Sequence, residues 1–141
     1  LSSTYLGGSG SDHWTSLEVQ NGYLYLFGKT RSADFPITQD AVQKEYDNSV
    51  QPDSSQLWMA GDITVTALSP DLDRIVYSTY LGGNSLDFIR SYSFDLKGKI
   101  ILAGGTYSDN FPVTKNACQL SRIGNQDGFY TIINQYITMI F

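Results

Sequence analysis

The sequence predicts an all-β fold made of two repeated, four-stranded antiparallel units. Three observations lead to this prediction: strand and turn formers dominate the composition, an internal repeat divides the chain, and the segments between the turns have the length of strands. The 141 residues include 13 Gly, 10 Tyr and 7 Phe but only two Glu. Tyrosine and phenylalanine favour strands and glycine favours turns, whereas residues typical of helices are scarce.

The internal repeat consists of collinear series of matching residues. Residues 3–8, Ser-Thr-Tyr-Leu-Gly-Gly, return as residues 78–83 at a spacing of 75, and Asp12 falls on Asp87. A second series at a spacing of 76 matches Gly22, Leu26, Gly28, Thr30, Ser32, Phe35, Pro36, Thr38, Ala41 and Gln43 with Gly98, Leu102, Gly104, Thr106, Ser108, Phe111, Pro112, Thr114, Ala117 and Gln119. The spacing then drops to 65, where Asp62 matches Asp127 and Thr66 matches Thr131, so the first copy carries an insertion within residues 44–61. A repeat of this kind determines the whole architecture.

The first strand of each unit is expected at residues 13–19 and 88–94, where apolar and polar residues alternate. A hairpin turn follows in each copy. Asn21-Gly22 is the dipeptide that accepts positive φ at both central positions of a type I′ turn, and Lys97-Gly98 stands at the same place in the second copy.

The second strands, residues 23–27 and 99–103, are largely apolar on both faces, which predicts a sheet that is covered on both sides. A structured loop with a Phe-Pro pair follows at 32–38 and 108–114, because proline is excluded from central strands and phenylalanine can anchor the loop. Third strands are expected at 62–68 and 127–133, and a fourth at 74–81 after a turn at 69–71.

Four-stranded antiparallel units that are covered on both faces and joined by Gly-rich turns are typical of β-propeller blades. The first blade is assigned to residues 1–76, with a leading half-strand from a neighbouring blade, and the second to residues 77–141, with a partial fourth strand. Propellers contain about four to eight blades, so two blades predict an incomplete ring that other chains or a longer parent chain would complete.

The two ends of the chain are expected to share a strand. Residues 1–8 have the sequence of the second half of a fourth strand, and residues 137–141 stand where the first half belongs. Joined tail to head, they would rebuild one strand, within a ring or between chains; excision from a longer chain is the alternative. The candidate assembly residues are Leu1, Ser2, Ser3, Thr4, Tyr5, Ile137, Thr138, Met139, Ile140 and Phe141.

The recurring Ser-Thr-Tyr-Leu-Gly-Gly, the Asp that follows it, the Gly-x-Thr-x-Ser-x-x-Phe-Pro-x-Thr block and the Asp before the third strand together resemble the SBBP family, the bacterial and archaeal β-propeller repeat. The resemblance covers residues 1–136. It implies a propeller in secreted or cell-surface proteins, often without an assigned activity, and it supplies no catalytic residues. The approach to the third strand at 56–61 and the segment 135–141 depart from the family pattern.

Composition excludes several classes of function. A net charge of −5, a pI of about 4.5 and scattered basic residues argue against nucleic acid as a partner. No apolar run approaches the roughly 20 residues of a membrane span. The single Cys118 rules out an internal disulfide framework, and the single His13 rules out a His-based metal cluster within one chain. We therefore expect no catalytic residue, no metal and no cofactor, and a protein that is not an enzyme.

Individual polar residues are expected to have structural roles. His13 is predicted at a turn or sheet edge, and Cys118, which matches Val42, as a small buried hydrophobic residue. Asp12 and Asp87 follow Gly-containing turns, so hydrogen bonding to local backbone is favoured over calcium ligation.

The predicted function is a non-catalytic module for assembly or for interaction with proteins or ligands, outside the cell or at its surface. Its expected partners are copies of itself or further blades of a longer chain. The alternative is a lectin-like, carbohydrate-binding propeller, since sugars stack on aromatic rings and bind planar polar groups. Trp58 would instead pack the insertion onto the blade if it has a structural role. The candidate glycan-binding residues are Tyr46, Asp47, Asn48, Asp53, Gln56 and Trp58.

Overall fold

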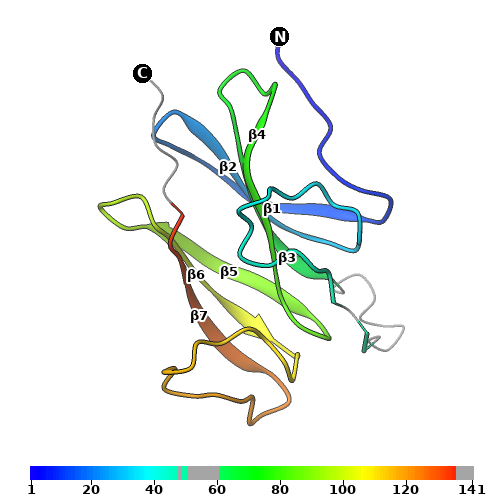
Figure 1. The fold of residues 1–141 in the computed structure, drawn as a ribbon, viewed down its shortest axis with the longest axis vertical. Helices are drawn as coiled ribbons and strands as arrows, with labels where there is room; N and C mark the ends of the chain where they lie inside the picture. The colour runs from blue at the N-terminus through cyan, green and yellow to red at the C-terminus, as the bar shows by residue number, and fades with distance from the viewer. Residues whose placement is uncertain (48, 51–60, 136–141) are drawn as a thin grey trace.

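The computed structural model describes residues 1–47, 49–50 and 61–135, and these form seven β-strands in two antiparallel sheets (Figure 1). The first sheet has the order β1-β2-β3-β4 and the second the order β5-β6-β7. The described residues contain no helix, and so none that is long and apolar enough to cross a membrane. The strands are β1 (Asp12–Gln20), β2 (Tyr23–Thr30), β3 (Asp62–Leu68), β4 (Ile75–Leu81), β5 (Asp87–Phe94), β6 (Ile100–Thr106) and β7 (Asp127–Ile133).

The all-β prediction is confirmed, and the first copy forms the expected four-stranded sheet. Among the described residues the second copy has three strands, and the predicted partial fourth strand at 137–141 lies outside these residues. The strand β4 crosses the predicted boundary between residues 76 and 77 and pairs with β3 throughout. The first sheet therefore extends to Leu81.

The two hairpin turns differ, although they occupy the same place in the repeat. Asn21 and Gly22 have φ values of 52° and 82°, as a type I′ turn requires. In the second copy only Gly98 has a positive φ, of 82°. There the carboxylate of Asp95 accepts hydrogen bonds from the backbone N–H groups of Lys97 and Lys99, both at 2.8 Å. The carboxylate thus holds a wider turn where the sequence predicted a second tight one.

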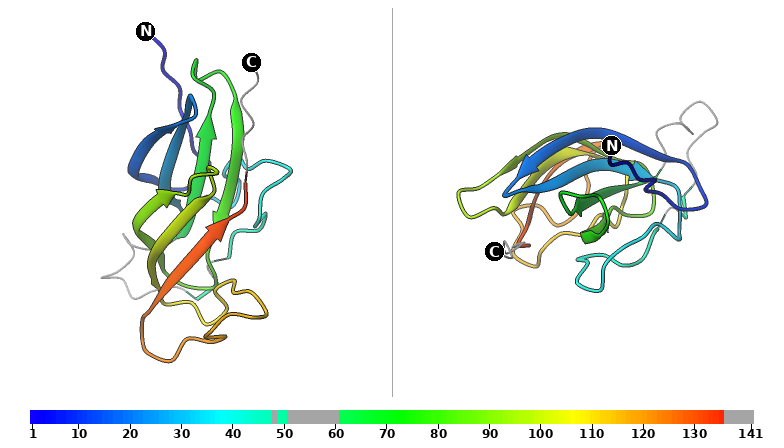
Figure 2. Two further views of the ribbon diagram at one scale, coloured as in Figure 1. Left: turned by 90° about the vertical axis from the view of Figure 1, so that its left-hand side faces the viewer. Right: turned by 90° about the horizontal axis from the view of Figure 1, so that it is seen from above.

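The two sheets pack face to face through aromatic side chains. The ring of Phe27 on β2 stacks on Tyr92 of β5 at 4.1 Å between centroids, and Tyr25 meets Phe94 edge-on at 4.8 Å. The hydroxyl of Ser16 also donates a hydrogen bond to the Tyr92 hydroxyl at 2.9 Å. Figure 2 shows the two sheets lying against one another as layers. One continuous apolar core therefore joins both copies of the repeat.

Each sheet has a front and a back face, and the front of the first packs on the back of the second. In the first sheet the front face carries Tyr25, Phe27, Ile63 and Val65, and the back face carries Leu17, Val19, Leu24 and Leu26. In the second sheet the front face carries Ile101, Ala103, Tyr130 and Ile132, and the back face carries Tyr92, Phe94, Ile100 and Leu102. The prediction that β2 is covered on both sides is confirmed only for its front, since Leu17 and Val19 beside its back face are 53% and 62% exposed.

Candidate assembly site

In the first sheet, the strand β4 lies between β3 and the loop of residues 31–43. On one side β4 pairs with β3 along its whole length. On the other side the backbone N–H of Thr38 donates to the carbonyl of Ser78 at 3.0 Å, and the N–H of Tyr80 donates to the carbonyl of Gln43 at 3.2 Å. Both edges of β4 are thus hydrogen-bonded, which removes the open edge that a last strand would otherwise expose.

The side chain of Tyr80 fixes β4 against this loop. Its hydroxyl donates to the carbonyl of Ser32 at 2.8 Å and accepts from the backbone N–H of Phe35 at 3.0 Å. Tyr80 and Phe35 are 1% and 3% exposed, and their rings lie 6.3 Å apart. Burial raises the pKa of Tyr80 to about 12, so the hydroxyl keeps the proton that it donates.

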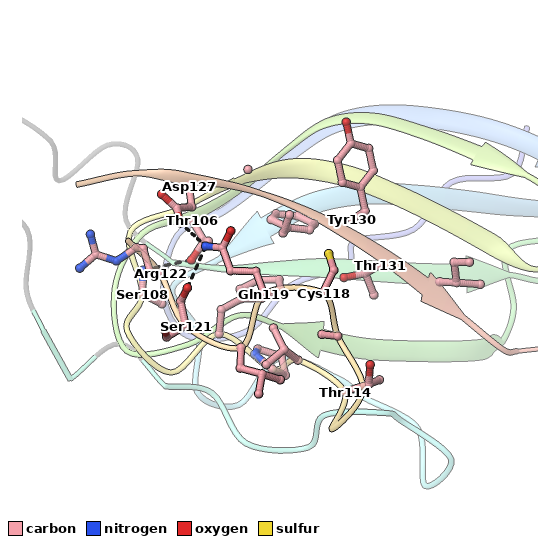
Figure 3. Close-up of a pocket in the computed structure, with 18 of the residues that line it drawn as sticks. Thr106, Ser108, Thr114, Cys118, Gln119, Ser121, Arg122, Asp127, Tyr130 and Thr131 are labelled. Carbon is pink, nitrogen blue, oxygen red and sulfur yellow. Dashed lines mark hydrogen bonds between the residues drawn. The ribbon is translucent and has the colours of Figure 1, made fainter. Parts of the chain in front are cut away.

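The second copy has a groove at the corresponding place, between β7 and the loop of residues 107–122 (Figure 3). Its volume is about 730 Å³. Within the described residues β7 has a single strand partner, β6. The groove is lined by the counterparts of the residues that hold β4, among them Ser108, Phe111, Thr114, Gln119 and Thr131.

The loop beside this groove already has the geometry of its first-copy counterpart. The side-chain N–H of Gln43 donates to the Glu45 carbonyl at 2.8 Å and to Asp62 at 3.2 Å. Gln119 makes the same pair of hydrogen bonds, to the Ser121 carbonyl at 2.8 Å and to Asp127 at 2.6 Å. The groove therefore repeats these hydrogen bonds of the seat of β4, which consists of Ser32, Phe35, Thr38, Gln43 and Thr66. It differs at Phe111, which is only half-buried and stacks at 4.5 Å on Phe129, where the first copy has Thr64.

A repeated polar frame holds the turn that leads into each sheet. The carboxylate of Asp12 accepts from the Gly8 N–H at 2.9 Å, and that of Asp87 accepts from the Gly83 N–H at 2.8 Å. The hydroxyl of Ser32 likewise accepts from the Gly10 N–H at 2.8 Å, as Ser108 does from the Ser85 N–H at 2.9 Å. The prediction that these two aspartates bind local backbone is confirmed.

Two buried carboxylates lie close together where the sheets meet. Asp62 and Asp87 are both 0% exposed, and a Cβ atom added at Gly82 would be 2.8 Å from each of them. Burial raises the pKa of Asp62 to about 8, and the neighbouring Asp87 adds to that rise. Burial raises the pKa of Asp87 as well. Among the described residues no three His, Cys, Asp or Glu side chains are grouped to hold a metal.

The structure places the candidate assembly residues of the first segment in solvent. Residues 1–5 are exposed and belong to no strand, with Leu1 and Tyr5 showing 122% and 103% of their reference areas. In Figure 1 this segment runs away from the sheets. Ile137, Thr138, Met139, Ile140 and Phe141 lie outside the described residues, so the predicted tail-to-head strand stays a prediction.

The candidate glycan site is described only in part. Tyr46 is half-buried with its ring 6.0 Å from that of Tyr80, and the Asp47 carboxylate accepts from the Asn110 side chain at 3.1 Å. That hydrogen bond lowers the pKa of Asp47. Both residues therefore have contacts within the chain. Asn48, Asp53, Gln56 and Trp58 lie outside the described residues, so the structure does not bring the six together.

Two further residues were assigned structural roles. His13 lies exposed on the edge strand β1, as predicted. The prediction of a buried Cys118 is wrong, because its thiol-bearing side chain is exposed at the groove. Val42, its partner in the repeat, is itself 58% exposed, so this position is not buried in either copy.

The repeat aligns the loop residues that hold β4, and Phe35 was expected to anchor the loop, but the sequence did not predict that they hold a strand. Their signal was present, because Ser32, Phe35, Thr38 and Gln43 are identical to their partners 76 residues later. No protein-family model, curated protein or solved structure matches this chain. The likeness to the SBBP repeat therefore rests on the sequence motifs.

Proposed function

We propose that this chain is a non-catalytic repeat module of the β-propeller type, which assembles by stacking the front face of one sheet on the back face of the next. The observation that carries this proposal is the packing of the first sheet's front face on the second sheet's back face. The outer two faces are the repeat partners of these packed faces. They offer the same kind of contact to a further unit, either of a second copy or of a longer chain.

Both outer faces expose apolar side chains. On the front of the second sheet Tyr130 and Ile132 are 87% and 59% exposed, whereas their repeat partners Val65 and Ala67 are completely buried. On the back of the first sheet Leu17 and Val19 are exposed, and their partners Tyr92 and Phe94 pack on the first sheet's aromatics. Contiguous exposed apolar residues of this kind mark interaction surfaces.

The exchanges between the two front faces conserve volume. Phe27 is replaced by Ala103, while Val65 is replaced by Tyr130, and Ala103 and Tyr130 are direct neighbours across β6 and β7. A large ring is therefore lost from one strand and gained on the adjacent one. Volume-conserving exchanges are the ones that close-packed interfaces tolerate best. The front of the second sheet remains suited to packing.

The proposed contact is heterologous, since a front face meets a back face. Such contacts generate closed rings when the rotation closes and open arrays when it does not.

The two carboxyl groups with a raised pKa, Asp62 and Asp87, are both completely buried within their own chain. Neither is accessible to a substrate, which supports a non-catalytic role. We place the module outside the cell or at its surface, which the likeness to the SBBP repeat implies.

Sedimentation velocity over micromolar to submillimolar concentrations tests the proposal. The wild type should self-associate, and Val19→Asp or Ile132→Asp should each raise the dissociation constant by at least about tenfold, because each buries a charge in an apolar contact. Leu96→Asp is the matched control, since Leu96 is 108% exposed and lies in the turn after β5. It should associate like the wild type.

Mixing the two variants tests the direction of the contact. The Val19→Asp protein keeps an intact front face and the Ile132→Asp protein an intact back face, so the mixture should form a one-to-one complex that grows no further. A wild type that sediments only as the 15.7 kDa monomer throughout this range contradicts the proposal, as does a mixture that stays monomeric.

A further inference from the structure

We propose that the groove beside β7 binds the segment Leu1–Gly8 of a second copy of this chain as an added β-strand, with Tyr5 as its anchor. The inference deepens the proposed assembly function by naming the segment and the seat, and it rests on that function for its biological role. The ligand expected in the groove is a peptide that contains the sequence Ser-Thr-Tyr-Leu-Gly-Gly. Strand addition at an exposed sheet edge is an established mode of peptide recognition.

The incoming segment matches the second half of β4 and the two glycines after it, whereas Leu1 and Ser2 stand where the first copy has Val76 and Tyr77. Residues 3–8 repeat residues 78–83 without a change. Ser3, Thr4 and Tyr5 thus offer the same hydroxyl groups as Ser78, Thr79 and Tyr80. They are exposed and belong to no strand. The segment is therefore accessible to a second molecule.

The seat is identical at each position that makes a side-chain hydrogen bond to β4. In the first copy Thr38 binds the Ser78 backbone through its hydroxyl at 3.0 Å, and the Thr79 hydroxyl accepts from the Gln43 N–H at 3.0 Å. The Thr66 and Ser78 hydroxyls also share a hydrogen bond of 2.9 Å. The repeat supplies Thr114, Gln119 and Thr131 at these places, and all three line the groove.

The pairing of β3 with β4 fixes the register of the proposed strand. Thr64 pairs with Tyr80 and Thr66 with Ser78, which places Tyr5 opposite Phe129 and Ser3 opposite Thr131. The Tyr5 hydroxyl would then lie between the Ser108 carbonyl and the Phe111 N–H, as the Tyr80 hydroxyl lies between Ser32 and Phe35. Shifting the register by one residue would turn Tyr5 away from this site.

Fluorescence anisotropy with a labelled peptide of residues 1–8 tests the inference. The receptor is the full-length Val19→Asp protein, whose substitution lies on the first sheet, away from the groove, and weakens the proposed stacking. We expect saturable binding, reduced about tenfold by Tyr5→Phe in the peptide, because the hydroxyl makes two hydrogen bonds to the seat. Amide exchange should slow in β7 when the peptide binds.

The receptor variants locate the binding site. Thr114→Val should weaken peptide binding several-fold, because it replaces the hydroxyl that would bind Ser3. The matched control Thr38→Val alters the seat of β4 and should leave the peptide affinity unchanged in protein that remains folded. If Thr114→Val fails to fold, a dissociation constant that is equal for the native and the Tyr5→Phe peptide still decides against the anchor.

The outcomes separate this inference from the stacking proposal. A native peptide that binds no better than a scrambled one overturns the groove assignment, even if the wild type self-associates and Val19→Asp prevents it. Peptide binding together with a Val19→Asp protein that self-associates as strongly as the wild type supports the groove and overturns stacking. Slowed amide exchange in β1 instead of β7 also overturns the inference, because it places the peptide on a different edge.

Discussion

Replacing Tyr80 with phenylalanine removes one buried hydroxyl oxygen, which joins β4 to the loop of residues 31–43. The hydroxyl donates to the Ser32 carbonyl and accepts from the Phe35 N–H, and all three residues are at most 3% exposed. The ring and its packing against Phe35 remain in the variant. The perturbation therefore isolates the two hydrogen bonds from the aromatic contact.

The expected cost is about 1.5 kcal/mol of unfolding free energy. A net hydrogen bond contributes about 1 kcal/mol, and a buried polar group left without a partner costs about 1 to 3 kcal/mol. The Phe35 N–H keeps a longer bond of 3.3 Å to the Ser32 carbonyl, which places the loss in the lower half of that range. With an unfolding entropy of about 2.1 cal/mol/K per residue, the melting temperature should fall by about 5 °C.

Urea denaturation followed by tryptophan fluorescence and circular dichroism measures the effect. Tyr5→Phe is the matched control, because the same residue in the first segment is exposed and makes no such bridge. At concentrations where the protein is monomeric, the control should leave the midpoint unchanged. A Tyr80→Phe variant within about 0.3 kcal/mol of the wild type would refute the bridging role, since that is the scatter of neutral surface changes.

Three further changes have defined outcomes. Asp62→Asn should gain stability relative to the wild type as the pH rises from about 4 to 8, because the folded state holds a proton on Asp62 that the unfolded chain releases above its ordinary pKa. Parallel urea titrations at several pH values measure this difference, and a pH-independent difference contradicts the raised pKa. Gly82→Ala should cost about 3 kcal/mol in the same assay, because its Cβ would lie 2.8 Å from Asp62 and Asp87. Gly22→Ala should cost only about 1 kcal/mol, since its φ of 82° strains alanine but nothing lies within 4 Å; equal losses at the two glycines would contradict this distinction.

The sequence predicts the strands well because the repeat and the alternation of apolar residues are local signals. Asn21-Gly22 specified its turn through backbone preference alone. The turn after β5 could not be predicted in the same way, because the carboxylate of Asp95 reaches two backbone groups ahead of it. The exposure of Cys118 was missed because the identity of a residue and that of its repeat partner, Val42, do not say which side of a loop faces solvent.

The groove was missed from the sequence for a related reason. The repeat showed that Phe111, Thr114 and Gln119 match the first copy, but only the structure shows that their partners hold a strand. The groove forms between a loop and the edge of a strand, and the identity of the residues alone does not show that the two face each other. Conserved identity between two copies locates such residues, and the contacts in one copy supply their role.

The two proposed contacts require the same neighbour. Within one chain, β4 completes the first sheet and continues through residues 82–86 into β5, the first strand of the sheet that stacks on its front. In a second copy, residues 1–6 would lead through residues 7–11 into β1 in the same way.

This connection already has the required conformation in both copies. The N–H groups of Gly8 and Ser9 bind Asp12 and Asp34 as those of Gly83 and Asn84 bind Asp87 and Asn110, with lengths of 2.6 to 2.9 Å. A neighbour whose segment enters the groove would therefore bring the back face of its first sheet onto the exposed front face without reordering the turn. Two linked contacts of this kind reinforce each other, because each raises the effective concentration for the other. A substitution that breaks either contact should therefore weaken the self-association of the protein far more than it weakens binding of the isolated peptide.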